Sequence, residues 1–128
     1  KGLVGCVYPK DNASGCTREG QDFRDNYNKF KRNKAVVVGV SRDSLKSHEN
    51  FIAKQEFPFE LLSDQDEALC TLFDVIKEKN MYGRKVMGIE RSTFLIDSNG
   101  KLRREWRKVK VDGHVEEVLA AVRELNRA

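Results

Sequence analysis

The amino-acid sequence predicts an α/β fold, with a mixed central β-sheet and helices on both of its faces. In the first half, apolar runs of strand length alternate with amphipathic segments, a pattern that requires parallel strands joined by crossover helices. Near residue 100, two strand-like runs flank Ser-Asn-Gly. This is a strong signal for an antiparallel hairpin, because Asn-Gly adopts positive φ at low cost. With 128 residues, 39% of them hydrophobic, the chain can bury one core, and we interpret 1–128 as a single domain.

The first half of the chain supplies the predicted parallel strands. Leu3–Tyr8 is mostly apolar without polar alternation, which is typical of a strand covered on both faces. Aromatic residues at intervals of four and three then predict one amphipathic helix from Thr17 to about Asn33. Ala35–Val40 is the second buried strand. The segment 41–44 opens the next helix, which Pro58 prevents from continuing.

The second half supplies the antiparallel strands. A short strand is predicted at 59–62, and the hairpin pairs 92–97 with 101–106. The segment 76–90 shows no clear period and is predicted to be a long loop. The hairpin therefore adds strands at the edge of the sheet.

Two shorter signals place the last helices. Asp64 and Glu67, three residues apart, resemble a capping box for a short helix at 68–73. Apolar residues at helical spacing predict a final helix over 115–125, capped by Asp112. The order of elements is then strand, helix, strand, helix, short strand, short helix, hairpin, helix, which is a thioredoxin-like arrangement.

Composition excludes several classes of protein. The net charge is only +4, from 24 Lys and Arg against 20 Asp and Glu, so the surface is charged without being of one sign. The longest apolar run, Ala35–Val40, is far shorter than the roughly 20 residues of a membrane helix. Cys6, Cys16 and Cys70 are odd in number and irregular in spacing, which suits neither a disulfide framework nor a metal site. We expect a cytoplasmic chain without metal or cofactor, although any targeting signal ahead of Lys1 would be missing.

Cys16 is the strongest candidate for chemistry. It lies where the loop 9–15 ends and a helix begins. Free N–H groups and a partial positive charge at a helix N-terminus favour the thiolate, so Cys16 is a candidate nucleophile. The alternative is a buried structural cysteine, but the small, polar run 11–15 offers no core in which to bury it.

The residues around Cys16 carry a specific resemblance to a known family. Residues 7–17 read VYPKDNASGCT, which is similar to the YPKDxTPGCT signature of the peroxiredoxins, in particular the peroxiredoxin Q or bacterioferritin comigratory protein group. Further segments agree in order and spacing, namely GVSRDS at 39–44, LSD at 62–64, KNMYG at 79–83 and ERSTFLID at 90–97. The resemblance covers nearly the whole chain. The family's N-terminal hairpin and helix are missing, so the chain resembles a truncated member.

The resemblance implies a thiol-dependent peroxidase. Cys16 would be the peroxidatic cysteine, which attacks a hydroperoxide and becomes a sulfenic acid. Arg91 would donate hydrogen bonds to the sulfur and the peroxide together. Pro9 would shield the sulfur from water, and Gly15 would belong to the substrate-binding loop. Glu19 would either orient the arginine or be a plain surface carboxylate that favours the helix dipole.

One departure from the family pattern lies in the substrate-binding loop. The family's Thr, three residues before the cysteine, hydrogen-bonds the peroxide, but this chain has Ala13, followed by Ser14 in place of Pro. Losing a hydrogen bond to a charged transition state costs roughly 1.5 to 3 kcal/mol, and about 1.4 kcal/mol is tenfold in rate. We therefore expect a slow peroxidase. The hydroxyl of Ser14 lies one residue after the position of the family's Thr, so it is not expected to replace that hydroxyl.

A second departure concerns the resolving cysteine. The positions at which the family places one hold Gln21 and Ile52. Cys70 remains a candidate, although its neighbours predict a packed helix face, and Cys6 lies in a buried strand. We expect thioredoxin, glutaredoxin or a small thiol to reduce Cys16 directly. The chain is expected to be a monomer or a weak homodimer.

Two other functions are compatible with parts of the sequence. A truncated chain with Ala13 could be a catalytically impaired remnant that acts as a binding or structural module. The basic segment 101–110 around Trp106 could bind nucleic acid, but a charged edge hairpin explains it better, so no nucleic-acid partner is expected. His48 and His114 are too poorly accompanied to form a metal site, and are interpreted as a helix-face and a capping-turn residue.

Overall fold

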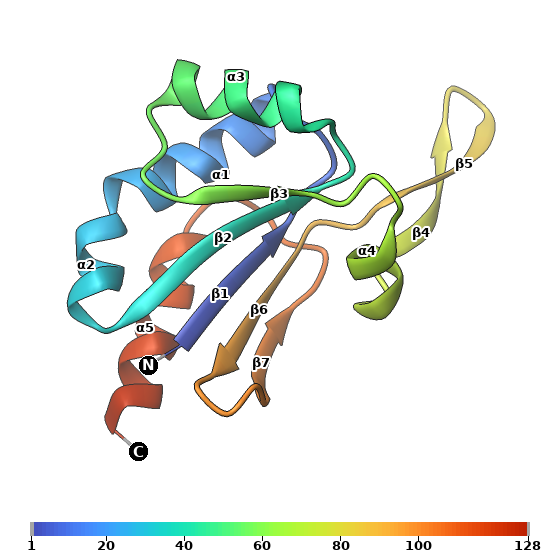
Figure 1. Ribbon diagram of the computed structural model, residues 1–128. Coiled ribbons are helices and arrows are strands. Elements are labelled where there is room, and N and C mark those ends of the chain that lie inside the picture. The colour runs from blue at the N-terminus through green and yellow to red at the C-terminus, as the bar shows by residue number, and fades with distance from the viewer. Residues whose placement is uncertain (1, 128) are drawn as a thin grey trace.

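A computed structural model describes residues 2–127, in which a five-stranded mixed sheet is the central element (Figure 1). The strands are β1 (Gly2–Val7), β2 (Ala35–Ser41), β3 (Glu60–Ser63), β6 (Ser92–Asp97) and β7 (Leu102–Trp106). They lie in the order β3-β2-β1-β6-β7, with β1, β2 and β3 parallel and β6 and β7 antiparallel. The mixed sheet and the hairpin predicted around residue 100 are confirmed.

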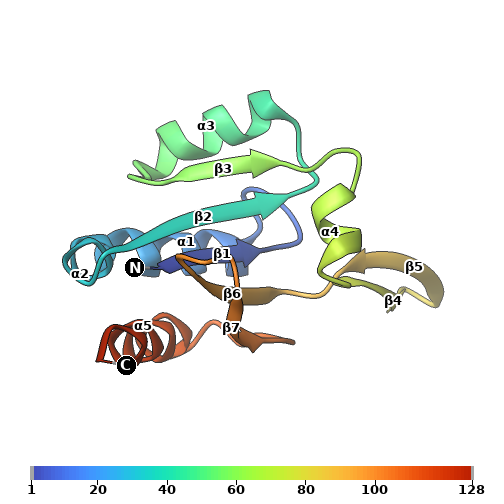
Figure 2. The same ribbon diagram turned by 60° about the horizontal axis from the view of Figure 1, so that its bottom comes forward.

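Helices pack on both faces of this sheet. They are α1 (Ser14–Asp25), α2 (Tyr27–Arg32), α3 (Leu45–Gln55), α4 (Ala68–Leu72) and α5 (His114–Arg127). Val4 and Cys6 of β1 face the larger core, to which α1, α2, α3 and α5 contribute. Val7 faces a smaller core built with Cys70 of α4. Figure 2 shows α4 at the right, apart from the other four helices. Side chains on the two faces of β1 thus pack into two different cores.

The predicted helix from Thr17 to Asn33 is in fact two helices, α1 and α2. Asn26 separates them, with φ −104° and ψ 5°. Its side-chain Nδ2 and its backbone N both donate to the carbonyl of Asp22. Asparagine competes in this way with the helical hydrogen-bond pattern, and apolar spacing alone does not register the break.

The prediction of a long loop at 76–90 was wrong. Strands β4 (Ile76–Met81) and β5 (Arg84–Ile89) form a separate antiparallel hairpin there. The two turn residues, Tyr82 and Gly83, have φ of 53° and 79°, which is the pattern of a two-residue turn. No strand period was visible because most of this hairpin is exposed on both faces. Figure 1 shows it projecting away from the central sheet.

The two predicted helix caps also differ in detail from the structure. Asp64 does precede α4, but its carboxylate accepts from the backbone N–H groups of Leu69 and Cys70, at 3.0 and 2.8 Å, rather than forming a box with Glu67. Asp112 lies before α5 and forms an ion pair with Arg18 of α1. Both carboxylates therefore sit at helix N-termini, as the macrodipole favours.

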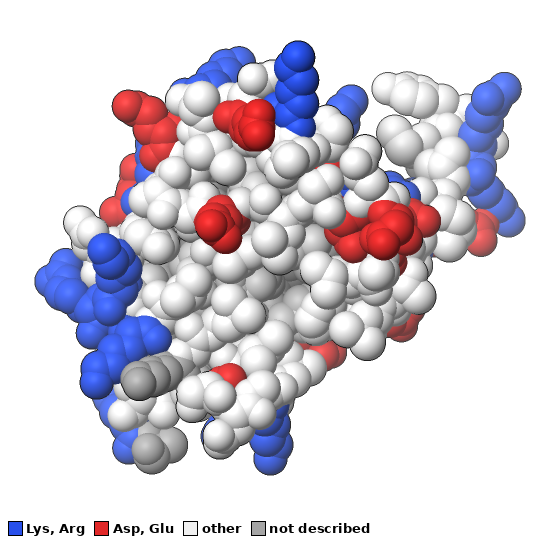
Figure 3. Space-filling view, in the orientation of Figure 1, with Lys and Arg blue, Asp and Glu red and all other residues white. Residues whose placement is uncertain are grey.

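The surface carries charges of both signs, as the composition predicts. Figure 3 shows acidic side chains scattered over the sheet face and basic ones gathered at the margins, over α2 and over the β4–β5 hairpin. Within the described residues, no helix has the length and apolar character needed to cross a bilayer.

Candidate active site

The connection from β1 to α1 positions Cys16. Ala13 is the residue at which α1 begins, and its carbonyl accepts the first hydrogen bond of the helix from the N–H of Thr17 at 2.8 Å. Cys16 is therefore in the first turn, as predicted. Its side chain is buried, at 4% exposure, and packs into the larger core. The prediction that the polar loop leaves no core around Cys16 was wrong, because Val111, Tyr8 and other distant residues close over this turn in the fold.

Arg91 reaches Cys16 from the link between β5 and β6. Its Nη2 donates to Cys16 Sγ at 3.2 Å, and its Nη1 donates to Glu19 Oε1 at 2.9 Å. The N–H of Val109 donates to the backbone carbonyl of Arg91 at 3.0 Å, which fixes the link. A Cβ on Gly15 would lie 3.0 Å from Nη2, so glycine gives the guanidinium its room. The structure brings together Cys16, Arg91, Glu19 and Gly15.

Glu19 is buried, at 3% exposure, and is not the surface carboxylate of the alternative interpretation. Burial raises the pKa of Glu19 to about 6, although Arg91 acts in the opposite direction. Burial also opposes the charge on Arg91, but the adjacent Glu19 and Cys16 outweigh it and raise the arginine's pKa. The ion pair therefore keeps a positive guanidinium against the sulfur.

The second oxygen of Glu19 is not satisfied. Oε2 is buried without a hydrogen-bond partner, and His114 Nε2 is 4.0 Å away from it. That nitrogen lies 2.8 Å from Thr93 Oγ1 instead. Burial lowers the pKa of His114 to about 4, so the ring is neutral near pH 7. The site thus holds a buried carboxylate with unused hydrogen-bonding capacity.

The remaining loop residues bring no polar side chain to the sulfur. Pro9 is half-buried in the loop after β1. Ala13 is exposed, with φ −66° and ψ 146°, and its methyl group leaves the start of α1 without a side-chain cap. Because Ala13 has no hydroxyl, its side chain can neither cap α1 nor donate a hydrogen bond at the site.

A second polar cluster, around Asp11 in the loop between β1 and α1, was missed by the sequence analysis. Asp11 Oδ1 accepts from Tyr8 Oη at 2.6 Å, and Oδ2 lies 2.7 Å from His48 Nδ1 and accepts from Ser47 Oγ at 2.7 Å. The Asp11 backbone N–H donates to Asp43. His48 is a buried residue of α3, which agrees with its interpretation as a helix-face residue. The Tyr-Pro-Lys-Asp run was a visible signal, but only the fold reveals that α3 supplies the partners.

The other two cysteines are buried and unreactive in character. Burial raises the pKa of Cys6 well above its ordinary value, and burial together with Asp64 raises that of Cys70 to about 12. At the family's resolving positions, Gln21 donates to Gln55 at 3.0 Å and Ile52 packs against the larger core. All three cysteines are free thiols. Within residues 2–127, no cluster of His, Cys, Asp or Glu suits a metal ion.

Comparison with known proteins agrees with this geometry. Residues 1–105 match the AhpC/TSA family. Peroxiredoxin Bcp of Xanthomonas campestris is 60% identical over 121 residues, which cover 94% of this chain and 76% of that protein. Peroxiredoxin Bcp of Bacillus subtilis is 48% identical over 126 residues, which cover 98% of this chain and 80% of that protein.

Solved structures lead to the same group. The bacterioferritin comigratory protein of X. campestris, whose structures concern alkyl peroxide reduction, has a TM-score of 0.93 and 57% identity, covering 98% of this chain and 80% of that chain. AhpC of Mycobacterium tuberculosis has a TM-score of 0.80 and 27% identity, covering 98% and 69%. These matches confirm the thioredoxin-like fold and the resemblance stated above. The chain therefore belongs to the AhpC/TSA family and is a peroxiredoxin of the Bcp or peroxiredoxin Q group, an oxidoreductase that reduces hydroperoxides through a cysteine thiol.

Proposed function

We propose that Cys16 is the peroxidatic cysteine and that Arg91 stabilises its transition state. The contact that supports this most directly is the Arg91 guanidinium, which donates to Cys16 Sγ through one nitrogen and to Glu19 through another. The Cys16 thiolate attacks one oxygen of ROOH, the S–O bond forms as the O–O bond breaks, and the alkoxide leaves with a proton as ROH. The fixed positive charge of Arg91 stabilises the negative charge as it moves onto the leaving oxygen.

In this proposal Glu19 is a positioning residue. Its Oε1 holds one edge of the guanidinium, so that the other edge faces the sulfur. A buried arginine that had no such partner would pay a large desolvation cost and could turn away. Gly15 leaves the space that this orientation needs, and Pro9 covers the loop side of the site.

The same proposal makes the reaction slow. Ala13 offers no hydroxyl to the incoming peroxide, and no side-chain hydrogen bond is formed at that helix terminus. A hydrogen bond to a charged group is worth about 1.5 to 3 kcal/mol, so the rate constant is expected to be about tenfold or more below that of a chain with threonine. Hydrogen peroxide and small organic hydroperoxides are the proposed substrates.

Reduction of the oxidised Cys16 is proposed to need a thiol from outside the chain. Gln21 and Ile52 occupy the resolving positions, and Cys6 and Cys70 are buried with raised pKa values. Thioredoxin, glutaredoxin or a small thiol would supply the electrons. We place the chain in a reducing cytoplasm, as a monomer or weak homodimer.

The test is intact mass of the reduced protein after brief, near-stoichiometric hydrogen peroxide with a sulfenic-acid trap present. We expect one trapped adduct in the parent chain and none in Cys16→Ser. Cys70→Ser is the matched control, because it removes a free thiol outside the site, and it is expected to keep the adduct. Equal, slow reaction of the parent and Cys16→Ser would reject the proposal in favour of a binding module.

A further inference from the structure

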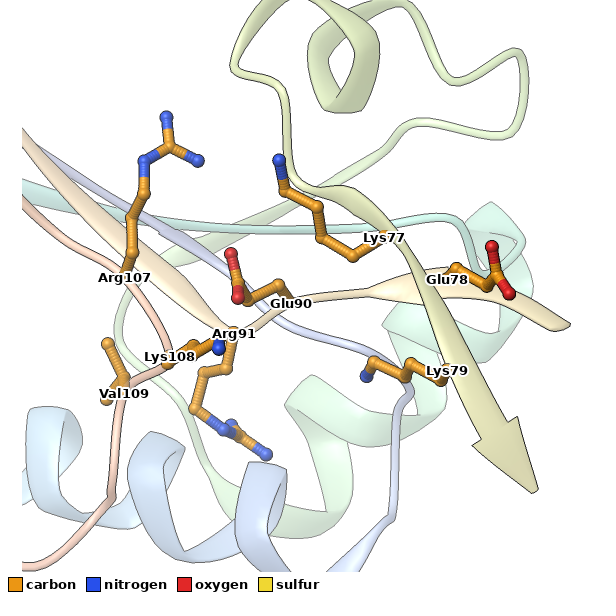
Figure 4. Close-up of a pocket in the computed structure, with 8 residues that line it drawn as sticks. All are labelled: Lys77, Glu78, Lys79, Glu90, Arg91, Arg107, Lys108 and Val109. Atoms are coloured by element: carbon orange, nitrogen blue, oxygen red, sulfur yellow. The ribbon is translucent and has the colours of Figure 1, made fainter. Parts of the chain in front are cut away.

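A basic groove includes Arg91 in its lining, but its other residues have no part in the function proposed so far. Its volume is about 910 Å³. It is lined by Lys77, Glu78 and Lys79 of β4, by Glu90 and Arg91 of the β5–β6 link, and by Arg107, Lys108 and Val109 after β7 (Figure 4). Five of these side chains are cationic and two are acidic, which gives the lining a positive formal charge. Three of the cations also pair with carboxylates outside the lining, namely Lys77 with Asp74, Arg91 with Glu19 and Arg107 with Glu105. Cavities of roughly 300 to 1,000 Å³ hold small organic ligands, whereas hydrogen peroxide needs far less space.

The walls of the groove are held in place. Arg107 donates from Nη1 and Nη2 to the carbonyls of Asp74 and Phe73, at 2.9 and 2.8 Å. The N–H of Val109 donates to the carbonyl of Arg91, so the segment after β7 is tied to the β5–β6 link. A preformed site of this kind pays less entropy when a ligand binds.

Arg91 connects the groove to the reactive sulfur. It is one of the lining residues, and Figure 4 shows its guanidinium turned away from Glu90 and Arg107, toward the helices beneath. There its Nη2 is 3.2 Å from Cys16 Sγ. A small molecule in the groove therefore lies one side chain away from Cys16. Because Cys16 is only 4% exposed, a slender molecule can approach the sulfur more easily than the surface of another protein.

We propose that this groove binds the carboxylates of a small anionic thiol, which then reduces the oxidised Cys16. The proposal rests on the proposed function, and it selects one reductant class among those considered above. Two carboxylates on one small molecule would complement Lys77 and Lys108, which lie on opposite walls of the groove. The Lys77 ammonium donates to Asp74 Oδ2 at 3.2 Å, so the ligand would share this cation with Asp74 or replace Asp74.

The chemistry is balanced with thiols alone. The first thiolate attacks the sulfur of Cys16–SOH, an S–S bond forms, and the S–O bond breaks. The hydroxide leaves with a proton as water, giving a mixed disulfide. A second thiol then attacks the ligand's sulfur in that disulfide and releases the Cys16 thiolate. Cys16 gains two electrons, and two thiols are oxidised to one disulfide.

A kinetic test compares two small thiols on the sulfenic form of the protein. Mercaptosuccinate carries two carboxylates, and 2-mercaptoethanol is neutral; the mixed disulfide is followed by quenching and intact mass. We expect the ratio of the mercaptosuccinate rate to the mercaptoethanol rate to fall about tenfold or more in Lys77→Glu/Lys108→Glu. The matched control is Lys46→Glu/Lys101→Glu, which makes the same change in net charge at exposed positions outside the groove.

A binding measurement tests whether the groove binds a dicarboxylate, without requiring any reaction with peroxide. The thioether (methylthio)succinate, which cannot react, is titrated into the reduced parent chain and into both double variants. Saturable binding that is lost only in Lys77→Glu/Lys108→Glu supports the proposal, even if Cys16 forms no sulfenic acid and the proposed function fails. Absence of binding to the parent, or equal loss in both double variants, overturns it.

A last experiment tests whether the carboxylate that binds the groove belongs to the reducing thiol or to the hydroperoxide substrate. The oxidation step is measured with a hydroperoxide that bears a carboxylate and with a neutral one of similar size. If Lys77→Glu/Lys108→Glu slows only the carboxylated hydroperoxide and leaves the thiol ratio unchanged, the groove serves the oxidising substrate and the reductant proposal is wrong.

Discussion

Two buried polar clusters differ in how well their carboxylates are paired, one around Asp11 in the loop between β1 and α1 and the other around Glu19 in α1 itself. Asp11 has both carboxylate oxygens occupied, by Tyr8, Ser47 and His48. Glu19 pairs with Arg91 through Oε1, but its Oε2 has no hydrogen-bond partner. A fully satisfied buried network rigidifies a fold, whereas a buried polar atom without a partner is costly and is found at reactive sites. We infer that the Asp11 cluster holds the loop and the Glu19 cluster performs chemistry.

The strongest test of this difference is to remove the positive charge of Arg91 from the Glu19 cluster. Arg91→Met keeps much of the length of the side chain and deletes both donors. The second-order rate constant with hydrogen peroxide is expected to fall about 10²- to 10³-fold, which is typical for the loss of a donor to a developing anion. Stopped-flow kinetics on the reduced protein measures it.

The control is Arg103→Met, since Arg103 pairs with Asp97 on the exposed edge hairpin. It is expected to leave the rate within about twofold of the parent. A rate for Arg91→Met within about threefold of the parent would show that the guanidinium does not act on the reacting atoms.

The Asp11 cluster is expected to respond in stability instead. Asp11→Asn replaces the carboxylate that lies between Tyr8, Ser47 and His48 with an amide whose NH2 group faces hydrogen-bond donors, and the lost hydrogen bonds to a charged group cost about 3 kcal/mol of the free energy of unfolding. Urea unfolding measures the loss. The peroxide rate of the folded variant is expected to fall far less than that of Arg91→Met.

A milder variant tests whether the loss of stability increases with the number of hydrogen bonds to Asp11 that are removed. Ser47→Ala removes one hydrogen bond to Asp11, which is worth about 1 kcal/mol. If Asp11→Asn costs no more than Ser47→Ala, or if it abolishes the peroxide rate, the division between a holding cluster and a reacting cluster fails.

The same two clusters show how far the sequence could predict the site. Cys16 was predicted from its position at the start of a helix and from the family signature around it, whereas Arg91 was predicted only from the resemblance of its segment to the family. The contacts of Asp11 with His48 span 37 positions along the chain. Hydrophobic periodicity does not encode such a pairing, so only the packing of α3 against the loop reveals it.

The fold was predictable where burial imposes a period on the sequence. The strands β1, β2, β3 and β6 contribute buried residues to two cores, and their apolar character was recognised. The exposed strand β7 was predicted instead from the Ser-Asn-Gly turn before it. The β4–β5 hairpin lacks this constraint, since its turn residues and most of its strand residues are exposed. The break at Asn26 depends on side-chain hydrogen bonds to Asp22. Local polar contacts and exposed strands therefore set the limits of the sequence analysis.

The pH dependence of stability offers a smaller test of the Glu19 cluster. Its pKa is about 6 in the folded chain against an ordinary 4.5, so the folded state binds this proton more tightly, and the stability it adds at low pH is lost as the pH rises through 6. His114 has the opposite sign. Its pKa is lowered from 6.5 to about 4, so its contribution is present above pH 6.5 and is lost as the pH falls toward 4.

Between pH 4.5 and 6.5 these two contributions oppose each other in the parent chain. In Glu19→Gln only that of His114 remains, so acidification from pH 7 to 4.5 is expected to lower its free energy of unfolding by about 1 to 2 kcal/mol more than in the parent. Urea unfolding at several pH values measures the difference. Parallel curves for the two proteins would mean that Glu19 titrates as an ordinary carboxyl group.

The smallest expected effect is a gain, at the one position where the reacting cluster lacks a family hydroxyl. Ala13→Thr places a hydroxyl at the start of α1, where the backbone already has the extended conformation of a cap residue. Such a cap stabilises a protein by about 1 kcal/mol, and a new hydrogen bond to the peroxide is expected to raise the rate constant at least several-fold.

Ala13→Val separates these effects, because valine has the branched shape of threonine without its hydroxyl. We expect Ala13→Val to match the parent chain in rate and to lack the added stability, as measured by stopped-flow kinetics and urea unfolding. A gain in stability without a gain in rate would show that the threonine hydroxyl serves the helix terminus alone. In that case the slow reaction would have to originate in the burial of Cys16 rather than in the loss of a peroxide-binding hydroxyl.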